Sequence, residues 1–263
     1  MSTIYDFGAH DGTDIKYYLL KAERVIAVEA NPKLVDLLRS RYSKEIADGR
    51  LVVQHCALSQ RDDGRPIDFY VHRQSSVLSQ INPPKPELAH QFDRVSVPAR
   101  TPSSIVREFG VPWYVKCDIE HFDGAVLDDL FENSICPPFI SAEAHNIDVF
   151  ARLVLNTQYK AFKIVSGGRV RRELSKTTIS TASGQQTFRF EGDTSGPFGH
   201  DIPGLWLPAN VAFYQLAYEN LGHIDIHATT LEIPAYLGNR LGGGMTIRQM
   251  ARMLRLGKKN KKR

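Results

Sequence analysis

The chain has 263 residues, of which 42% are hydrophobic and 24% are charged, a composition typical of an ordinary globular protein. This length favours one large α/β domain with insertions over two separate domains. The formal net charge of +4 comes from the C-terminus: residues 258–263 (KKNKKR) carry five positive charges, which leaves −1 for the rest of the chain. The body of the chain therefore gives no general basis for nucleic-acid binding, and we expect no nucleic-acid partner.

The apolar runs and the cysteines place the chain in the cytoplasm. No apolar run is long enough to span a bilayer, and the N-terminus enters a predicted strand too early to hold a signal peptide. The three cysteines, Cys56, Cys117 and Cys136, are odd in number and lack metal-type spacing. They predict buried thiols in a reducing compartment.

The first 29 residues have the pattern of a βαβ unit. Residues 4–7 form an apolar run that predicts a buried strand, and a turn containing Gly8 and Gly12 follows it. A helical pattern comes next, and a second apolar strand over residues 25–28 ends at Glu29. This carboxylate lies 21 residues beyond Gly8, about the interval at which such folds place an acceptor for ribose hydroxyls. Glycine in the turn predicts a backbone that a ligand approaches closely.

Further along the chain, strands and helices continue to alternate. The expected strands are residues 51–53, 67–71, 95–99, 113–117, 139–142 and 159–165, and the expected helices are 32–43, 101–109, 126–131, 149–156 and 208–221. This alternation predicts an α/β fold with a doubly wound, mostly parallel sheet. A serine- and proline-rich stretch at residues 74–86 predicts a loop over a site.

The C-terminal hundred residues are less regular. Residues 166–204 are rich in Gly, Ser and Thr and show no helical period, and we expect a lid there with a β-excursion at 186–190. A capping box at Thr246 begins a helix whose basic side carries Arg248, Arg252 and Arg255. We therefore divide the chain into a cofactor-binding core, a lid and acceptor-side extension of the same domain, and a basic amphipathic helix with its tail. These parts comprise residues 1–165, 166–245 and 246–263.

The predicted sheet brings polar residues together, because parallel α/β sheets bind ligands at the carboxyl ends of their strands. The residues that the sequence places there are 8–12, Glu29, 55–59, 118–123 and 143–145. A glycine turn with a ribose carboxylate indicates a nucleoside-containing cofactor. The G-x-G-x-x-G pattern that holds a pyrophosphate is absent, since residue 13 is Thr. S-adenosyl-L-methionine, an adenosine cofactor without a pyrophosphate, fits this pattern best.

Four ordered motifs resemble the FkbM family of S-adenosylmethionine-dependent methyltransferases. They are D-x-G-A-x-x-G at residues 6–12, VIAVEANP at 25–32, ALS at 57–59 and KCDIE at 116–120. The resemblance covers roughly residues 3–165 and implies a Rossmann-like class I methyltransferase fold with O-methylation of sugars or natural-product hydroxyls. It also implies that methionine, ribose, adenine and the reacting end are contacted in turn along the chain. The cofactor-binding residues implied are Asp6, Gly8, Ala9, Gly12, Glu29, Ala57 and Asp118. The family usually has glycine where this chain has His121.

Methyl transfer to an alcohol benefits from a general base. Glu143 and His145 follow a predicted strand with period-2 alternation, so both should point to the same side, near Asp118 on the neighbouring strand. The candidates for the base are His145, His121, Glu143, Asp118 and Glu120. We predict His145, with Glu143 or Asp118 orienting it, and no metal. A structural role for His145 stays open, as does Mg²⁺ or Mn²⁺ binding by the cluster. Glu120 and Asp123 can also be helix caps or surface ion-pair partners.

These observations predict an S-adenosylmethionine-dependent O-methyltransferase that acts on a hydroxyl of a sugar or glycan precursor. Three alternatives remain: a metal-assisted O-methyltransferase of a small natural product, a non-catalytic nucleotide-binding partner module, and a nicotinamide dehydrogenase. The expected partner is a small-molecule or glycan acceptor. The basic C-terminal element allows weak contact with a membrane surface, although a docked helix with a solvated tail is favoured. The sequence does not indicate an oligomeric state.

Overall fold

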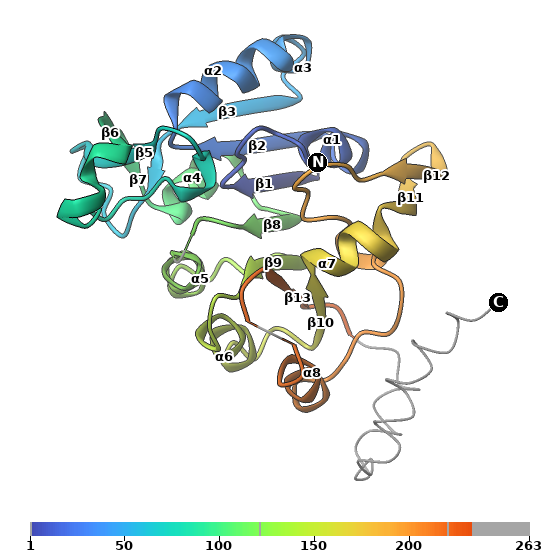
Figure 1. The fold of residues 1–263 in the computed structure, drawn as a ribbon. Coiled ribbons are helices and arrows are strands. Elements are labelled where there is room, and N and C mark those ends of the chain that lie inside the picture. The colour runs from blue at the N-terminus through green and yellow to red at the C-terminus, as the bar shows by residue number, and fades with distance from the viewer. Residues whose placement is uncertain (1, 121, 220, 233–263) are drawn as a thin grey trace.

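A computed structural model describes residues 2–232, apart from residues 121 and 220. Its centre is a seven-stranded sheet with the strand order β10-β13-β9-β8-β1-β2-β3 (Figure 1). All neighbouring pairs are parallel except the two that involve β13, which runs antiparallel to β9 and β10. The strands are β1 (Thr3–Phe7), β2 (Arg24–Glu29), β3 (Leu51–His55), β8 (Tyr114–Cys117), β9 (Phe139–Glu143), β10 (Ala161–Ser166) and β13 (Ile224–Thr229). The predicted α/β, mostly parallel sheet is confirmed.

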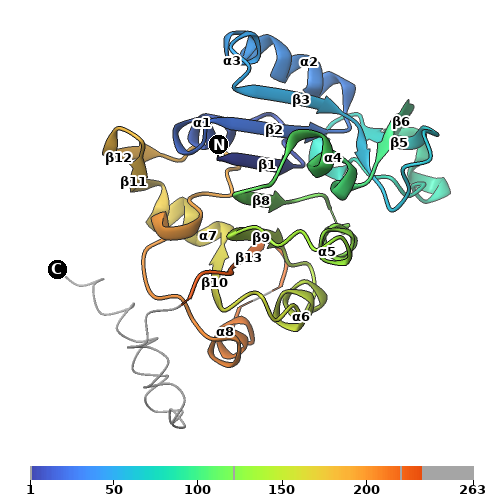
Figure 2. The same ribbon diagram turned by 180° about the vertical axis from the view of Figure 1, so that it is seen from behind.

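The helices cover both faces of the sheet because the strand order reverses at β1. From β1 the chain moves outward through β2 to β3, and its crossovers contain α1 (Ile15–Lys21) and α2 (Pro32–Arg41). After β8 it moves the opposite way, through α5 (Asp123–Glu132) and α6 (Asp148–Leu155). Right-handed crossovers in opposite directions put their helices on opposite faces, as Figures 1 and 2 show. The reversal between β1 and β8 is where such sheets bind ligands.

Two apolar clusters hold these layers together. One joins the sheet to α4 (Pro102–Phe109), α5, α6 and α8 (Ala209–Leu216). The other joins the opposite face to α1 and α2 and to aromatic residues from the chain beyond β10. Thr101 caps α4 by accepting a hydrogen bond from Ser104 N at 3.2 Å, and Pro102 occupies the first helical turn, as the sequence predicts.

Two small sheets lie between β3 and α4, where the sequence predicts two strands and a loop. The antiparallel pair is β5 (Ile67–His72) with β6 (Phe92–Val97), and the parallel pair is β4 (Ala57–Leu58) with β7 (Ala99–Arg100). The intervening loop contains a short helix, η1 (Ser76–Leu78), and Ser76 Oγ lies 2.6 Å from His10 Nε2 in the glycine turn. The loop therefore contacts the predicted site.

The chain beyond residue 165 differs most from the sequence-based expectation. β13 is a strand that the sequence does not predict, and it lies inside the central sheet, so the sheet is not confined to residues 1–165. Its apolar residues alternate with Asp225 and His227, which interrupt the apolar run. Residues 166–204, expected to lack helical structure, begin with α7 (Gly167–Arg169) and a π-helix (Val170–Leu174).

A hairpin and a long segment follow the π-helix and cover the face that carries α1. The hairpin pairs β11 (Lys176–Thr181) with β12 (Gly184–Arg189), which extends the predicted β-excursion. The segment of residues 190–207, called the strap below, packs Phe198 on Tyr114 with their ring centroids 3.8 Å apart and nearly parallel. α8 then ends at Leu216 rather than at residue 221.

The remaining predictions concern the cysteines, membrane-spanning helices and the C-terminal segment. Cys56 and Cys117 are buried free thiols as predicted, whereas Cys136 is also free but partly exposed. Within the described residues, no helix is both long and apolar enough to cross a membrane. His121, the predicted helix at Thr246 and the basic tail lie outside the described residues. The division into core, lid and terminal parts stays a prediction.

Candidate active site

The glycine turn after β1 is shaped by neighbouring protein atoms. Gly8 has a φ of +86°, and a Cβ added there would lie 1.9 Å from the carbonyl oxygen of Asp118. Gly12 has a φ of +78°, and its added Cβ would lie 2.4 Å from Leu38 Cδ2. Both positions therefore need glycine for their conformation and their packing. Protein atoms occupy the space that a side chain would need, from the segment after β8 at Gly8 and from α2 at Gly12. Close approach of a ligand to this turn stays a prediction.

Glu29 ends β2 beside this turn and is 8% exposed. Its two carboxylate oxygens accept hydrogen bonds from the backbone N–H groups of His10, at 2.9 Å, and Asn31, at 2.8 Å. Burial raises the pKa of Glu29 to about 7, and these hydrogen bonds oppose that rise. A carboxylate oxygen has two lone pairs, so each can accept a second donor such as a hydroxyl. Glu29 thus both holds the turn and stays able to bind a ligand.

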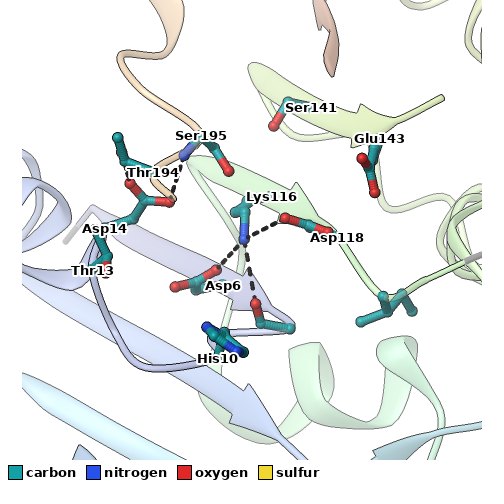
Figure 3. Close-up of polar contacts among 12 residues, drawn as sticks. Asp6, His10, Thr13, Asp14, Lys116, Asp118, Ser141, Glu143, Thr194 and Ser195 are labelled. Atoms are coloured by element: carbon teal, nitrogen blue, oxygen red, sulfur yellow. Dashed lines mark hydrogen bonds and ion pairs between the residues drawn. The ribbon is translucent and has the colours of Figure 1, made fainter. Parts of the chain in front are cut away.

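A buried lysine, for which the sequence predicts no role, lies at the centre of the site. Lys116 Nζ is 3.4 Å from Asp6 Oδ1 and 3.2 Å from Asp118 Oδ2, and it donates to the Gly8 carbonyl oxygen at 3.3 Å. Figure 3 shows this ammonium group between the two carboxylates. Burial raises the pKa of Asp6 to about 7, although Lys116 lowers it. The structure therefore brings together the predicted residues Asp6, Gly8 and Asp118 through Lys116.

Asp14 joins the site to the strap through contacts that the sequence does not predict. It precedes α1 and is 6% exposed. Its carboxylate accepts hydrogen bonds from the Thr194 hydroxyl and, at 3.0 Å, from the Ser195 backbone N–H (Figure 3). Burial raises its pKa, and Lys116 opposes the rise. The strap is therefore attached at the edge of the site.

The predicted catalytic pair lies at the end of β9, next to β8. His145 Nε2 is 3.0 Å from Glu143 Oε2, and the two side chains are 19% and 13% exposed. Ala144 faces the core and is fully buried, as the alternation predicts. Asp225 of β13 lies directly opposite Glu143 in the antiparallel register. Burial raises the pKa of Glu143, and the charge of Asp118 raises it further.

Two further residues converge on this pair. Glu120 Oε2 lies 3.9 Å from His145 Nε2, and His223 Nδ1 lies 3.8 Å from the second Glu143 oxygen. Ligand atoms of Glu120, Glu143 and His145 all lie within 4.8 Å of one another. Metal–ligand bonds are about 2.0–2.6 Å long, so one cation could contact all three atoms. Asp123 is the first residue of α5, and its Oδ1 accepts a hydrogen bond from Ile119 N, four residues earlier, at 3.3 Å.

Ala57, the predicted adenine neighbour, lies two residues beyond the end of β3, where His55 pairs with Glu29. It begins β4 and is 2% exposed, and the preceding Cys56 N–H donates to the Glu29 carbonyl oxygen at 3.2 Å. A cavity of about 460 Å³ also borders the glycine turn, between Thr13, Lys16, Arg41 and Phe190. Neither Asp118 nor the Glu143–His145 pair lines this cavity, so it is separate from the predicted reacting end.

The strand order, numbered along the sheet's own strands, is 3-2-1-4-5-7-6 with strand 7 antiparallel, which is the Rossmann-like fold of class I methyltransferases. No protein-family model and no curated protein matches the chain.

Solved structures with a similar fold include methyltransferase FkbM from Methylobacillus flagellatus, at 16% identity and a TM-score of 0.42 over 63% of this chain and 40% of that one. They also include an S-adenosylmethionine-dependent O-methyltransferase from Thermotoga maritima, at 9% identity and a TM-score of 0.41 over 89% and 60%. A third, an O-methyltransferase from Bacillus cereus in complex with S-adenosylhomocysteine, has 8% identity and a TM-score of 0.37 over 86% and 73%. The chain thus spans less than two thirds of the first two proteins.

Proposed function

We propose that this protein is an FkbM-like methyltransferase that transfers a methyl group from S-adenosyl-L-methionine to a hydroxyl of a sugar or glycan precursor. One observation carries the proposal. Along the carboxyl edge of the sheet, a nucleoside-type acceptor (Glu29 with the glycine turn) and a candidate proton acceptor (His145 with Glu143) flank the Asp6–Lys116–Asp118 group. The methyl donor would span this edge, and the acceptor would enter at the His145 end.

The charge of the site supports this cofactor over a dinucleotide. The carboxyl groups of Asp6, Asp14, Asp118 and Asp225 all raise the pKa of Lys116, so acids outnumber the ammonium group around it. Burial raises the pKa of Asp6, Asp14 and Asp225, and a cationic ligand would favour their ionised forms. S-adenosylmethionine carries a sulfonium and an ammonium group, which an acidic site attracts. A nicotinamide dinucleotide carries an anionic pyrophosphate, which the same carboxylates repel. The acidic edge therefore disfavours the dehydrogenase alternative.

We assign the cofactor contacts to the described residues as follows. Glu29 accepts hydrogen bonds from the ribose hydroxyls, and Ala57 borders the adenine. Asp6 and the turn through Gly8, Ala9 and Gly12 hold the methionine part. Asp118 lies towards the reacting end, where its side chain is 35% exposed and can meet a ligand.

The acceptor hydroxyl would be activated by His145. S-adenosylmethionine supplies a methyl carbon bonded to a positively charged sulfur. The acceptor oxygen would take this carbon from the sulfur, which would leave as a neutral thioether, and the imidazole of His145 would take the hydroxyl proton. The Glu143 carboxylate, 3.0 Å from Nε2, orients the ring and stabilises its protonated form. Positioning and proton transfer are the two contributions that the protein makes to such a reaction.

A second candidate follows from the cluster of Glu120, Glu143 and His145. Their ligand atoms lie within 4.8 Å of one another, and carboxylates with imidazole suit Mn²⁺ and related cations. A cation there would bind the acceptor hydroxyl and lower its pKa, so the reaction would be metal-assisted.

The test is a titration of the protein with S-adenosylmethionine and with NADH, followed by turnover of nucleotide sugars and free glycans with EDTA or with MnCl₂. We expect binding of S-adenosylmethionine alone and methyl transfer that EDTA leaves unchanged. Binding of NADH instead would overturn the methyltransferase assignment. Turnover that EDTA abolishes and MnCl₂ restores would favour the metal-assisted reaction. Binding without turnover of any hydroxyl acceptor would favour a non-catalytic module.

A further inference from the structure

Lys116 is a charged residue inside an otherwise apolar strand. It pairs with Asp6 in the parallel register of β8 and β1, and it is 4% exposed. Its neighbours Val115 and Cys117 are fully buried. A lysine at such a position loses most of its hydration, which costs several kcal/mol unless other charges replace the water. Here the replacement comes from Asp6 on β1, Asp118 after β8 and the Gly8 carbonyl oxygen.

Stability alone gives no reason for this arrangement. Replacing a buried ion pair by apolar side chains of similar volume is often neutral or stabilising. Four carboxylates act on Lys116 from the surrounding elements, namely Asp118 after β8, Asp6 on β1, Asp14 before α1 and Asp225 on β13. One ammonium group therefore balances several acids at the position where the sheet reverses direction. Burial raises the pKa of Asp6, Asp14 and Asp225, and a second positive charge beside them would favour their ionised forms, so this arrangement is suited to a cationic ligand.

We propose that Lys116 is a positioning residue that keeps the carboxylates of Asp6 and Asp118 ionised, side by side, to receive the cationic end of the methyl donor. This inference rests on the proposed function. Asp6 is 1% exposed, and its Oδ1 has no hydrogen-bond donor apart from the ion-pair contact with Lys116. Without the ammonium group, burial would leave Asp6 protonated at neutral pH, and a protonated acid cannot balance a cation. Lys116 would thus act on the ligand through Asp6.

The test measures S-adenosylmethionine affinity by calorimetry from pH 6 to pH 9.5 for the wild type and for Lys116→Met. In the wild type, the pKa of Asp6 of about 7 predicts that affinity falls as the pH drops below 7. An opposite charge nearby lowers the pKa of an Asp by about 1–3 units, so Lys116→Met should move this midpoint upward by about that amount. At pH 7.5 Lys116→Met should bind S-adenosylmethionine at least about tenfold more weakly than the wild type. At pH 9.5 the difference in affinity should be smaller, because Asp6 is then ionised in more of both proteins.

Two further variants separate this role from a structural one. Asp6 and Glu29 both titrate near pH 7. Asp6→Asn removes one of these two groups, so its binding should depend less steeply on pH there than wild-type binding, and adding Lys116→Met should not shift the remaining profile. Lys163→Met removes another buried ammonium group, which is 5% exposed on β10 and donates to the Ile202 carbonyl oxygen. It should leave the pH profile unchanged. Thermal unfolding of each variant shows that it is folded.

The outcomes are distinct. A Lys116→Met profile with the wild-type midpoint would overturn the inference. So would a midpoint shift of the same size when Lys116→Met is introduced into Asp6→Asn. If Lys116→Met does not fold, an Asp6→Asn profile as steep near pH 7 as the wild-type profile still contradicts it. Absence of S-adenosylmethionine binding by the wild type at every pH would instead refute the proposed function, and the inference would fall with it.

Discussion

Two histidines flank the carboxylate of Glu143, and they differ in exposure. His145 is 19% exposed with Nε2 at 3.0 Å from one oxygen, whereas His223 is 94% exposed with Nδ1 at 3.8 Å from the other. We expect His145→Ala to lower kcat by about 10²–10⁴-fold, the usual contribution of a general base. Its affinity for S-adenosylmethionine should stay within about threefold, because cofactor binding does not use that proton.

The matched control is His223→Ala, which contacts the same carboxylate from solvent and should keep its turnover. Steady-state kinetics with one acceptor, together with a cofactor titration, measure both variants. If His223→Ala loses the activity and His145→Ala keeps it, the base is assigned to the wrong residue.

The sequence reveals some site residues because their spacing is local. Glu29 follows a strand at a set distance from Gly8, and Glu143 and His145 alternate past the end of another strand. Lys116 and Asp14 carry no such signal, because their roles depend on partners far away in the chain. Lys116 is matched by Asp6, 110 positions earlier, and only the register of β1 and β8 brings them together. The one sign of this role in the sequence is a lysine inside an apolar strand that is followed directly by an acidic residue.

The strap is fixed to α1 by Asp201, which is 6% exposed. Its carboxylate lies 2.7 Å from both the Tyr17 hydroxyl and Lys21 Nζ, and it accepts from Ser180 N at 3.0 Å. Asp201→Ala should lower the free energy of unfolding by about 3–5 kcal/mol, because it leaves the Lys21 ammonium group with the Ser180 carbonyl oxygen but no carboxylate. Urea unfolding measures the change.

Lys44→Ala serves as the control, since the Lys44–Asp48 pair lies at the surface and should contribute nothing measurable. A midpoint for Asp201→Ala equal to that of the wild type would show that the strap does not depend on this ion pair.

At the level of elements, the regular alternation as far as β10 follows from the sequence, while the chain beyond it does not. The π-helix and β13 have mixed apolar and polar patterns because each turns polar residues towards the site or solvent. Asp225 and His227 of β13 face the same side as Glu143 and Ser141, so the strand lacks a continuous apolar run. The apolar residues of β13 keep a period of two, but the polar residues between them interrupt the apolar run by which the sequence predicts the other buried strands.

Burial raises the pKa values of Asp6, Glu29 and Asp123 to about 7 each. In the unfolded chain these acids titrate near pH 4. Between pH 4 and pH 7 the folded protein therefore binds more protons, and its stability falls as the pH rises through this range. His227 opposes this trend, because burial lowers its pKa to about 3 and its contribution to stability is lost as the pH falls below about 6.5.

Three acids outweigh one histidine, so lowering the pH from 7.5 to 5.5 should raise the Tm of the ligand-free protein. We expect a rise of roughly 5 °C or more, since 1 kcal/mol corresponds to about 2–4 °C for a chain of this size. Differential scanning calorimetry measures it. Asp123→Asn, which lies outside the proposed binding residues, should reduce the rise. A Tm that falls on acidification over this interval would show that these carboxyl groups are ionised in the folded protein.

The whole account depends on a nucleoside cofactor bound at the carboxyl edge, and calorimetric titration of S-adenosylmethionine into wild type, Glu29→Gln and Glu29→Ala tests this most directly. A hydrogen bond to a charged acceptor is worth about 1.5–3 kcal/mol, so Glu29→Ala should weaken binding at least about tenfold. Glu29→Gln keeps the size of the side chain and should also bind more weakly. Wild-type affinity in both folded variants would contradict the account, because the ribose would then not be bound by the carboxylate that ends β2.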